Sequence, residues 1–288
     1  MESKKLTISI VNYNAGDYLL RCLASVEQVS SETPLRTIVV DNDSRDDSIE
    51  RAREKYRDVT FILNKENVGF GKAHNQALKQ LDTPYVLFLN PDAELVEGAL
   101  KYLIDYMDAH SEAGASSCKI EKADGSIDWA SHRGFPTPWA SFKYYFLNDD
   151  SLYHLTNRDM AQTHEVDCIV GAFFLTRKAV LDTVGFFDEA YFMYAEDIDL
   201  CLRIKQAGWK VMYIPEVKIL HHKGISSGLR AETRNETAAL PETRRRAQDA
   251  FYESMILFYK KHYEKKYPCL INRLAYSGIR LKWKMARK

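Results

Sequence analysis

Cysteine, net charge and long apolar runs are all scarce in this sequence of 288 residues. The five cysteines are scattered without a CxxC pair, a usage that argues against a disulfide framework and predicts reduced thiols in a cytosolic protein. Lys and Arg number 40, equal to Asp and Glu, so nucleic-acid binding over the whole surface is not expected. No stretch reaches the roughly 18 apolar residues of a membrane span, and the N-terminus lacks a signal-peptide core. We therefore expect a soluble or peripheral protein.

The first hundred residues alternate between strand and helix patterns, and the composition, 45% apolar and 28% charged, is that of a globular protein. The predicted strands cover 6–11, 37–40, 60–63 and 85–89, and the predicted helices cover 18–26, 48–56 and 71–81. Strands separated by helices predict a mostly parallel sheet with helices on both faces. The predicted class is therefore α/β, with a Rossmann-like mixed sheet.

The second half of the chain is less regular. Residues 111–165 contain a hairpin turn at 124–126 and an aromatic stretch at 135–146 that we expect to be loop-like. Beyond it we predict a buried strand over 168–176 and a helix over 195–207. Two short strands follow, over 211–214 and 217–220. The last elements are a mobile polar loop over 228–246 and an apolar helix over 250–263.

Polar side chains follow three of the predicted parallel strands. Asn12 and Asn14 come after the first strand, Asp41 and Asp43 after the second, and Asp92 after the fourth. Ligands bind beyond the carboxyl ends of strands in such sheets, so these residues indicate a site. The alternative for each of them is a turn or a helix cap.

A single carboxylate, Asp92, ends the segment Asn90-Pro91-Asp92 after an apolar strand. One carboxylate suits a hard divalent cation that takes its remaining ligands from water and substrate phosphates. A simple turn is the alternative interpretation of this segment.

The segment 186–199 concentrates acids and aromatic rings. Aromatic walls desolvate a neighbouring carboxylate and raise its pKa, which is one way to tune a general base. The alternative is that Glu196, Asp197 and Asp199 favour the dipole of a helix that starts there. We expect Asp199 to be mainly structural and Asp197 mainly functional.

Two adjacent histidines, His221 and His222, end a predicted strand and are followed by Gly224 and Ser226. Such a group can bind a metal ion or a diphosphate, although a lone histidine is more often structural. Successive residues of a strand point to opposite faces, so one histidine should face the site.

Seven motifs, taken together and in order, resemble family 2 glycosyltransferases, and within them bacterial rhamnosyltransferase-like enzymes of cell-surface polysaccharide assembly. They are VNYN (11–14), VVDNDSRDDS (39–48), NVGFGKAHN (67–75), LFLNPDAEL (87–95), GAFFLTRKAV (171–180), VGFFDEAYFMYAEDIDLCLRI (184–204) and HHKGISS (221–227). The resemblance implies a GT-A fold over 1–227, with a nucleotide-sugar half to about 110 and an acceptor half over 111–227. Residues 228–288 would form a basic amphipathic helical extension.

The resemblance also implies a nucleotide site. Asn12 and Asn14 would line the pocket, Asp41 would hydrogen-bond the pyrimidine, and Asp43 would support the base or ribose. The other implied nucleotide-binding residues are Asn67, Gly69 and Gly71, in a loop around the nucleoside, Lys72, near the diphosphate, and Asn90, which replaces the first acid of the family's DxD motif.

The implied reaction is a single displacement that inverts the anomeric carbon. Asp197 matches the catalytic base, and Asp92 with His221 matches the site of Mg²⁺ or Mn²⁺, with His222 as the fallback ligand. The residues that would shape or line the donor and acceptor pockets are Gly171, Phe187, Asp188, Glu196, His222 and, as stacking platforms, Trp139 and Tyr194.

The C-terminus is the basic part of the chain, because residues 260–288 carry ten Lys or Arg and one acid. Basic charge mixed with aliphatic residues and Trp283 is typical of a helix lying on anionic lipid. The alternatives are a helix packed on the catalytic core with a solvated basic tail, and self-association through 250–263 into a homo-oligomer.

The sequence thus predicts an inverting, metal-dependent glycosyltransferase that uses dTDP-rhamnose or a UDP-hexose and a saccharide or lipid-linked acceptor. We expect it in the cytoplasm or on the inner face of the cytoplasmic membrane. Two alternatives are a sugar-nucleotide nucleotidyltransferase and a non-catalytic nucleotide-sugar-binding component of an assembly complex. The first would carry a Gly-rich phosphate loop after the first strand, where this chain has VNYNAGDYLL.

Overall fold

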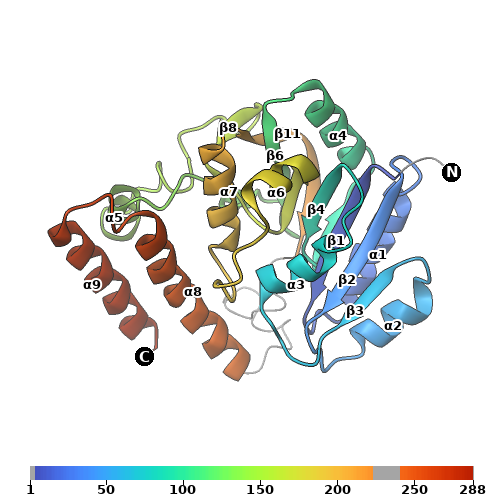
Figure 1. The fold of residues 1–288 in the computed structure, drawn as a ribbon, viewed down its shortest axis with the longest axis horizontal. Helices are drawn as coiled ribbons and strands as arrows, with labels where there is room; N and C mark the ends of the chain where they lie inside the picture. Colours follow the sequence, from blue (N-terminus) through green and yellow to red (C-terminus); the bar gives the residue numbers. More distant parts are fainter. Residues whose placement is uncertain (1–3, 223–240, 288) are drawn as a thin grey trace.

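The computed structural model describes residues 4–222 and 241–287 (Figure 1). In these ranges nine strands form one mixed sheet of order β3-β2-β1-β4-β10-β6-β11-β5, with β8 paired to β11. The strands of this sheet are β1 (Leu6–Asn12), β2 (Leu35–Asp41), β3 (Thr60–Leu63), β4 (Tyr85–Leu89), β5 (Ala93–Leu95), β6 (Ala113–Glu121), β8 (His164–Val166), β10 (Phe173–Arg177) and β11 (Lys210–His221). This confirms the predicted mixed, mostly parallel α/β sheet.

Helices cover both faces of the sheet because the strands are apolar on both sides. One face packs against α1 (Asp17–Val29), α2 (Ser48–Lys55) and α4 (Ala99–Ala109). The other packs against α3 (Phe70–Leu78), α6 (Lys178–Val184) and α7 (Glu196–Gln206). The strands β1, β2 and β3 are parallel to their neighbours, and β4 is parallel to β1, so their carboxyl ends share one edge.

Two strand predictions are wrong in detail. Residues 168–176 form two strands, β9 (Cys168–Ile169), paired with β7 (His132–Arg133), and β10, which runs antiparallel between β4 and β6. The two short strands predicted after 210 are one strand, β11, with a shift in register between Ile214 and Lys218. Pro215 lies in this shift and has no N–H to donate to the sheet.

Two loop predictions are also wrong. The aromatic stretch contains a helix, α5 (Pro138–Phe146), which begins where the Thr137 hydroxyl accepts a hydrogen bond from the Ala140 N–H at 3.1 Å. Residues 241–246 of the predicted mobile loop belong to α8 (Pro241–His262). The rest of that loop, 228–240, lies outside the described residues.

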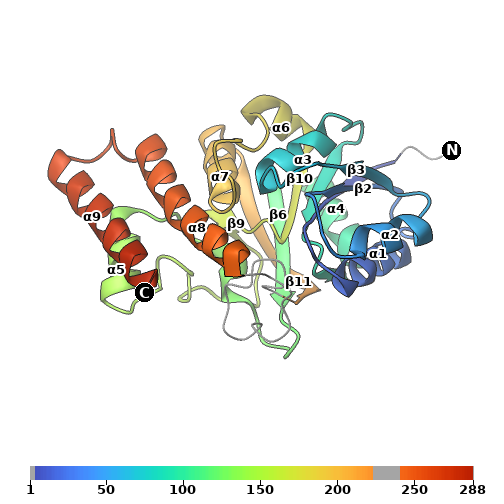
Figure 2. The same cartoon turned by 90° about the horizontal axis from the view of Figure 1, so that it is seen from below.

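The C-terminal helices lie at the end of the molecule opposite the parallel strands, together with α5 (Figure 2). The α8 helix packs on the second face of the sheet through Phe258 and Tyr259. By contrast, α9 (Cys269–Ala286) has no buried residue. No helix in the described ranges is long and apolar enough to cross a bilayer.

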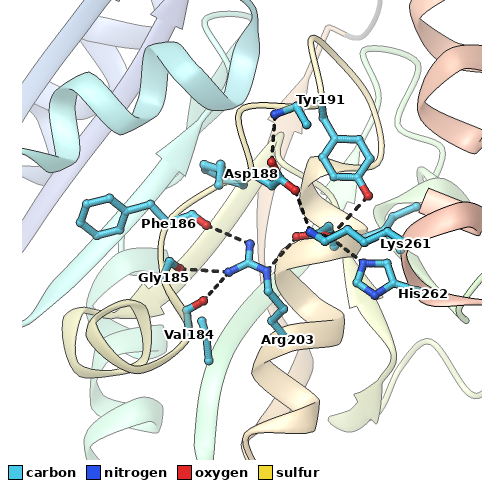
Figure 3. A network of polar contacts seen from close by, with 12 residues as sticks. Val184, Gly185, Phe186, Asp188, Tyr191, Arg203, Lys261 and His262 are labelled. Atoms are coloured by element: carbon cyan, nitrogen blue, oxygen red, sulfur yellow. Dashed lines mark hydrogen bonds and ion pairs between the residues drawn. The ribbon is translucent and has the colours of Figure 1, made fainter. Parts of the chain in front are cut away.

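A buried ion-pair network joins α8 to α7 (Figure 3). The Asp199 carboxylate is fully buried and lies 2.6 Å from Lys261 Nζ, 2.6 Å from His262 Nε2 and 2.8 Å from Arg203 Nε. Burial alone would raise the pKa of Asp199, but hydrogen bonds from His262 and Lys261 and the charge of Arg203 lower it far below its ordinary value. The expected structural role of Asp199 agrees with these contacts.

We expect Asp199→Asn to lower the free energy of unfolding by about 3 kcal/mol, because the fully buried carboxylate that pairs with Arg203 and Lys261 is then lost. Urea unfolding at pH 7 measures this loss. The pKa of Asp199 is lower in the folded than in the unfolded chain. Its contribution to the free energy of unfolding is therefore fully present above about pH 4 in the wild type and declines as the pH falls further.

Asp188→Asn is the matched control for this prediction. Asp188 also pairs with Lys261, at 2.7 Å, but 30% of its side chain is exposed. We expect its loss to cost less than about 1 kcal/mol. Equal effects of the two substitutions would contradict the importance given to burial of Asp199.

Candidate active site

The polar residues that follow β1 and β2 meet at the edge of the sheet. Asn12 and Asp41 are paired in the sheet register, both are buried, and the Asn12 amide donates to the Asp41 carboxylate at 2.8 Å. The Ser44 hydroxyl and backbone N–H donate to the two oxygens of Asp41 at 2.6 and 3.0 Å. The predicted cluster at the strand ends is therefore present, with Asp41 held in one orientation.

The loops around this cluster contain the other predicted nucleotide residues. Asn14 and Asp43 adopt left-handed backbone conformations, with φ of 52° and 65°. The Asn14 side chain accepts a hydrogen bond from the Arg45 N–H at 2.7 Å, and that of Asn67 accepts one from the Gly69 N–H at 3.0 Å. Asp43 is exposed, as is Lys72 on α3.

Glycines bring the start of α3 against the segment that precedes α7. A Cβ on Gly69, whose φ is 94°, would lie 2.4 Å from the Phe192 carbonyl oxygen. One on Gly71 would lie 2.9 Å from Phe187 Cβ. Only glycine tolerates both the left-handed backbone and this approach at position 69. These two glycines therefore set the distance between the loop at 67–71 and the acidic segment.

Asp92 and His221 form a buried pair. His221 Nε2 lies 3.1 Å from an Asp92 oxygen and 3.3 Å from the Asn90 amide nitrogen. Burial raises the pKa of Asp92, but the charge and hydrogen bond of His221 outweigh it, so the pKa lies below its ordinary value. His222 points elsewhere, toward Glu94 at 2.8 Å. Of the two histidines, His221 faces the predicted metal position.

The pair Asp92–His221 provides too few ligands to complete a metal site. Among the described residues no group of three or more His, Cys, Asp or Glu is placed to hold a metal ion. Two protein ligands do fit Mg²⁺ or Mn²⁺ if phosphate oxygens and water complete the shell. Gly224 and Ser226, the rest of the histidine motif, lie outside the described residues.

The Asp197 carboxylate is held at the start of α7 by backbone and side-chain donors. Its oxygens accept hydrogen bonds from the Ile198 N–H at 2.8 Å and the Gly171 N–H at 3.2 Å. Arg133 Nη2 lies 3.6 Å from the same oxygen that Gly171 contacts. The start of a helix also favours negative charge. Asp197 is thus oriented and 10% exposed, as a general base requires.

One short loop connects Asp197 to the end of β4. The Asn90 N–H donates to the Ala172 carbonyl at 3.1 Å, and the adjacent Gly171 N–H binds Asp197. A Cβ on Gly171 would lie 3.0 Å from the Phe70 ring. The loop between β9 and β10 therefore places Asp197 next to the segment that ends in Asp92.

Glu196 differs sharply from its neighbour Asp197. It is buried, and one of its carboxylate oxygens has no hydrogen-bond partner in the described ranges. Burial, and then the charge of Asp197, raises the pKa of Glu196 to about 8. Just before it, Tyr194 and Ala195 adopt left-handed conformations with φ of 71° and 65°. Strain of this kind, in residues other than glycine, concentrates at functional sites.

The remaining predicted pocket residues lie in different surroundings. Phe187 is buried against Phe88, with ring centroids 4.6 Å apart, and the Asp188 carboxylate faces Lys261 rather than Asp197. Trp139 is 59% exposed on α5. These positions remain predictions as pocket residues.

Sequence reasoning missed Arg133 in the site and His74 in the core, where His74 packs against Phe70 and Phe88. Arg133 contacts Asp197 from 64 residues away in the sequence, and no local pattern marks it. His74 is fully buried, with Nδ1 2.7 Å from the Ser9 hydroxyl, and burial lowers its pKa to about 3, so it is neutral. Its place in the NVGFGKAHN motif was the available signal.

The chain matches Glycosyl transferase family 2 over residues 7–185, more than half of its length. It belongs to this family. An N-acetylglucosaminyl-diphospho-decaprenol L-rhamnosyltransferase from Mycobacterium tuberculosis is 31% identical over 240 residues, 77% of this chain and 78% of that protein. Rhamnosyltransferase WbbL from Escherichia coli is 28% identical over 222 residues, 75% of this chain and 82% of that protein.

Solved structures agree with the implied GT-A fold. S. aureus TarS 1–349 in complex with UDP-GlcNAc superposes with a TM-score of 0.59 at 19% identity, covering 96% of this chain and 71% of that one. GalNAc-T7 with UDP, GalNAc and Mn²⁺ gives a TM-score of 0.58 at 15% identity, covering 91% and 58%. The family 2 member described here therefore has the glycosyltransferase fold predicted from its sequence.

We expect Glu196→Gln to flatten the pH dependence of stability. In the wild type, the raised pKa of Glu196 means that the fold favours its neutral form. Stability should therefore fall as the pH rises from the unfolded-state value near 4.3 to about 8. Urea midpoints at pH 5 to 9 measure the slope. A slope as steep in the variant as in the wild type would show that Glu196 is not the titrating group.

Proposed function

We propose that the enzyme transfers a sugar, with inversion, from a nucleoside-diphosphate sugar to a hydroxyl of a saccharide or lipid-linked saccharide in cell-surface polysaccharide biosynthesis. The observation that carries this proposal is the oriented carboxylate of Asp197 beside the loop that leads to Asp92. Family membership supports the reaction class.

In this reaction Asp197 accepts the proton of the acceptor hydroxyl. The hydroxyl oxygen then attacks the anomeric carbon, and the bond to the diphosphate breaks on the opposite side. One displacement inverts the configuration, so no covalent enzyme intermediate forms. Arg133 and the Gly171 N–H keep the base oriented.

The nucleotide would bind at the carboxyl ends of β1 and β2. Asn12, Asn14, Asp41 and Asp43 would contact the base and ribose there. Asp92 and His221 would hold Mg²⁺ or Mn²⁺, which would stabilise negative charge on the leaving diphosphate. The structural neighbour GalNAc-T7 was solved with both UDP and Mn²⁺, which supports this assignment.

The donor we favour is dTDP-rhamnose, because both relatives described above are named rhamnosyltransferases. A UDP-hexose is the second candidate. The lipid-linked acceptor is suggested by the name of the mycobacterial relative, which includes diphospho-decaprenol. A nucleotidyltransferase is disfavoured because family 2 contains glycosyltransferases and because β1 is followed by VNYNAGDYLL.

We also propose that α9 contacts an anionic membrane surface from the cytoplasmic side. It exposes Leu270, Leu274, Leu281 and Met285, each at least 56% exposed, among basic residues. Exposed apolar side chains mixed with basic charge are typical of interfacial helices. This placement would bring the site close to a lipid-linked acceptor.

The decisive test of the reaction is nucleoside-diphosphate release from dTDP-, UDP- and GDP-sugars, since many glycosyltransferases hydrolyse their donor slowly. We expect release from one donor, and a loss of at least about 100-fold in Asp197→Asn, because the general base is absent. Nucleotide binding by calorimetry should be unchanged in this variant. Near-normal turnover would remove Asp197 as the base.

Asp92→Asn tests the metal. We expect it to abolish the release that depends on Mg²⁺ or Mn²⁺, and chelator should do the same to the wild type. Activity that survives in chelator would contradict the metal assignment. Nucleotide binding without turnover, even with a range of acceptors, would favour a non-catalytic component.

Replacing three exposed basic residues of α9 tests the membrane contact. The variant Arg273→Gln, Arg280→Gln, Lys284→Gln should bind vesicles of 30% phosphatidylglycerol about 100-fold more weakly, from about 1 kcal/mol for each charge. Co-sedimentation at low salt measures the affinity.

A matched variant away from the C-terminal helices controls for total charge. Lys55→Gln, Arg57→Gln, Lys79→Gln removes the same charge from exposed positions in or directly after α2 and α3 (Figure 1). We expect this variant to bind the vesicles as the wild type does. If both variants lost vesicle affinity equally, the attraction to the vesicles would depend on total charge and not on α9, which would contradict the proposed membrane contact.

A further inference from the structure

A cavity of about 560 Å³ lies between the start of α7 and the helices α5, α8 and α9. Of the 26 residues that line it, four are charged: Arg133, Glu196, Asp197 and Lys282. The first three belong to the catalytic end described above, and Lys282 lies on α9. Almost all of the remaining wall is aromatic or aliphatic, with Phe142 of α5 and Met255 of α8 among its members.

The way α9 is attached to α8 keeps this cavity open. Near one end of α9, the Tyr259 hydroxyl donates to the Asn272 side chain at 2.8 Å. Near the other end, the Trp283 indole donates to Asp249 at 2.7 Å. Between these contacts α9 presents the small residues Ala275 and Gly278 to the cavity, and neither fills it.

The lining indicates a hydrocarbon as the occupant. A volume of about 560 Å³ lies within the range of roughly 300–1,000 Å³ found for small-molecule sites. The uncharged wall carries side-chain hydroxyls on six tyrosines and Ser141, but most of its surface is aromatic and aliphatic carbon, which forfeits dispersion contacts while nothing covers it. A flexible apolar chain in the cavity would supply these missing dispersion contacts.

The charged residues indicate how such a chain is attached. Arg133 lies at the catalytic end of the cavity, and its Nε is buried without a hydrogen-bond partner among the described residues. Lys282 Nζ lies 5.2 Å from the centre of the Tyr145 ring, and no carboxylate in the described ranges pairs with it. Arg133 already faces Asp197, at 3.6 Å, whereas Lys282 is a cation at the far side of a mainly apolar wall and suits a ligand whose hydrocarbon chain carries an anionic group such as a phosphate.

We propose that this cavity binds the hydrocarbon chain of a lipid-linked acceptor, whose saccharide end reaches Asp197. The proposal rests on the proposed function and adds the site at which the acceptor is held. The cavity is continuous with the base, because Asp197 itself lines it. It is also bounded by α9, whose exposed apolar and basic residues would lie at the bilayer from which the chain comes.

Gly278→Leu tests the proposal without endangering the fold. A Cβ at Gly278 meets no atom within 4 Å, so the added side chain extends into the cavity. Leucine also has a higher helix propensity than glycine, so α9 should not be weakened. Ser277→Leu is the matched control, because Ser277 is exposed on the same helix and does not line the cavity.

The first readout is binding and needs no donor. The fluorescent probe N-phenyl-1-naphthylamine should bind the wild type saturably and be displaced by decaprenyl phosphate. We expect Gly278→Leu to weaken both affinities at least about tenfold, and Ser277→Leu to change them less than about twofold. Unchanged binding in Gly278→Leu, or no saturable binding by the wild type, would overturn the proposal.

The second readout is transfer to N-acetylglucosaminyl diphosphates that carry either a decaprenyl or a methyl group. We expect Gly278→Leu to raise KM for the decaprenyl acceptor alone, with donor hydrolysis unchanged. Equal effects on both acceptors, or a change of oligomeric state relative to the wild type on gel filtration, would overturn the proposal. Absence of donor hydrolysis in the wild type would instead contradict the proposed function and leave the binding result intact.

Discussion

A single buried carboxylate, that of Asp199, joins the C-terminal helices to the catalytic end of the sheet. A fully buried carboxylate is tolerated only where hydrogen-bond donors surround it. Around Asp199, Arg203 comes from α7, the helix of Asp199 itself, while Lys261 and His262 come from α8 (Figure 3). This requirement restricts α8 to the position from which both of its residues reach Asp199. Asp199 and Asp197 both lie in the first turn of α7. The ion pairs that hold α8 on Asp199 therefore also fix the position of α8 relative to Asp197.

Three acids within this one helical turn have three different environments. Asp199 pairs with Lys261 and with the other basic side chains around it. Asp197 accepts hydrogen bonds from two backbone N–H groups and lies near Arg133. Glu196 is buried, and one of its carboxylate oxygens has no hydrogen-bond partner among the described residues. Environment rather than residue type therefore separates a structural charge, a carboxylate oriented by backbone donors and a carboxyl whose pKa is raised. All three lie in α7, where the helical geometry of 3.6 residues per turn makes their side chains face different directions.

The parallel half of the fold could be predicted closely, because apolar runs bounded by polar residues mark each buried strand. The meeting of Asn12 with Asp41 followed from the topology, since neighbouring parallel strands end at one edge. The α5 helix could not be predicted from periodicity, because it buries only Ala140. Arg133 was missed for a different reason: its contact with Asp197 depends on how β7 pairs with β9, which no local pattern specifies.

The C-terminal segment shows why composition alone left two interpretations open. Its aromatic, aliphatic and basic residues suit both a helix packed on the core and a helix at a membrane surface. The structure divides them between two helices: α8 buries Phe258 and Tyr259, whereas α9 buries nothing and leaves Leu274 62% exposed. A helix that packs on the core only through partly buried residues such as Ala275 and Tyr276, and that exposes apolar side chains, is costly to retain unless something else covers it. A lipid surface on its outer side and a hydrocarbon chain on its inner side would together remove that exposed area from water.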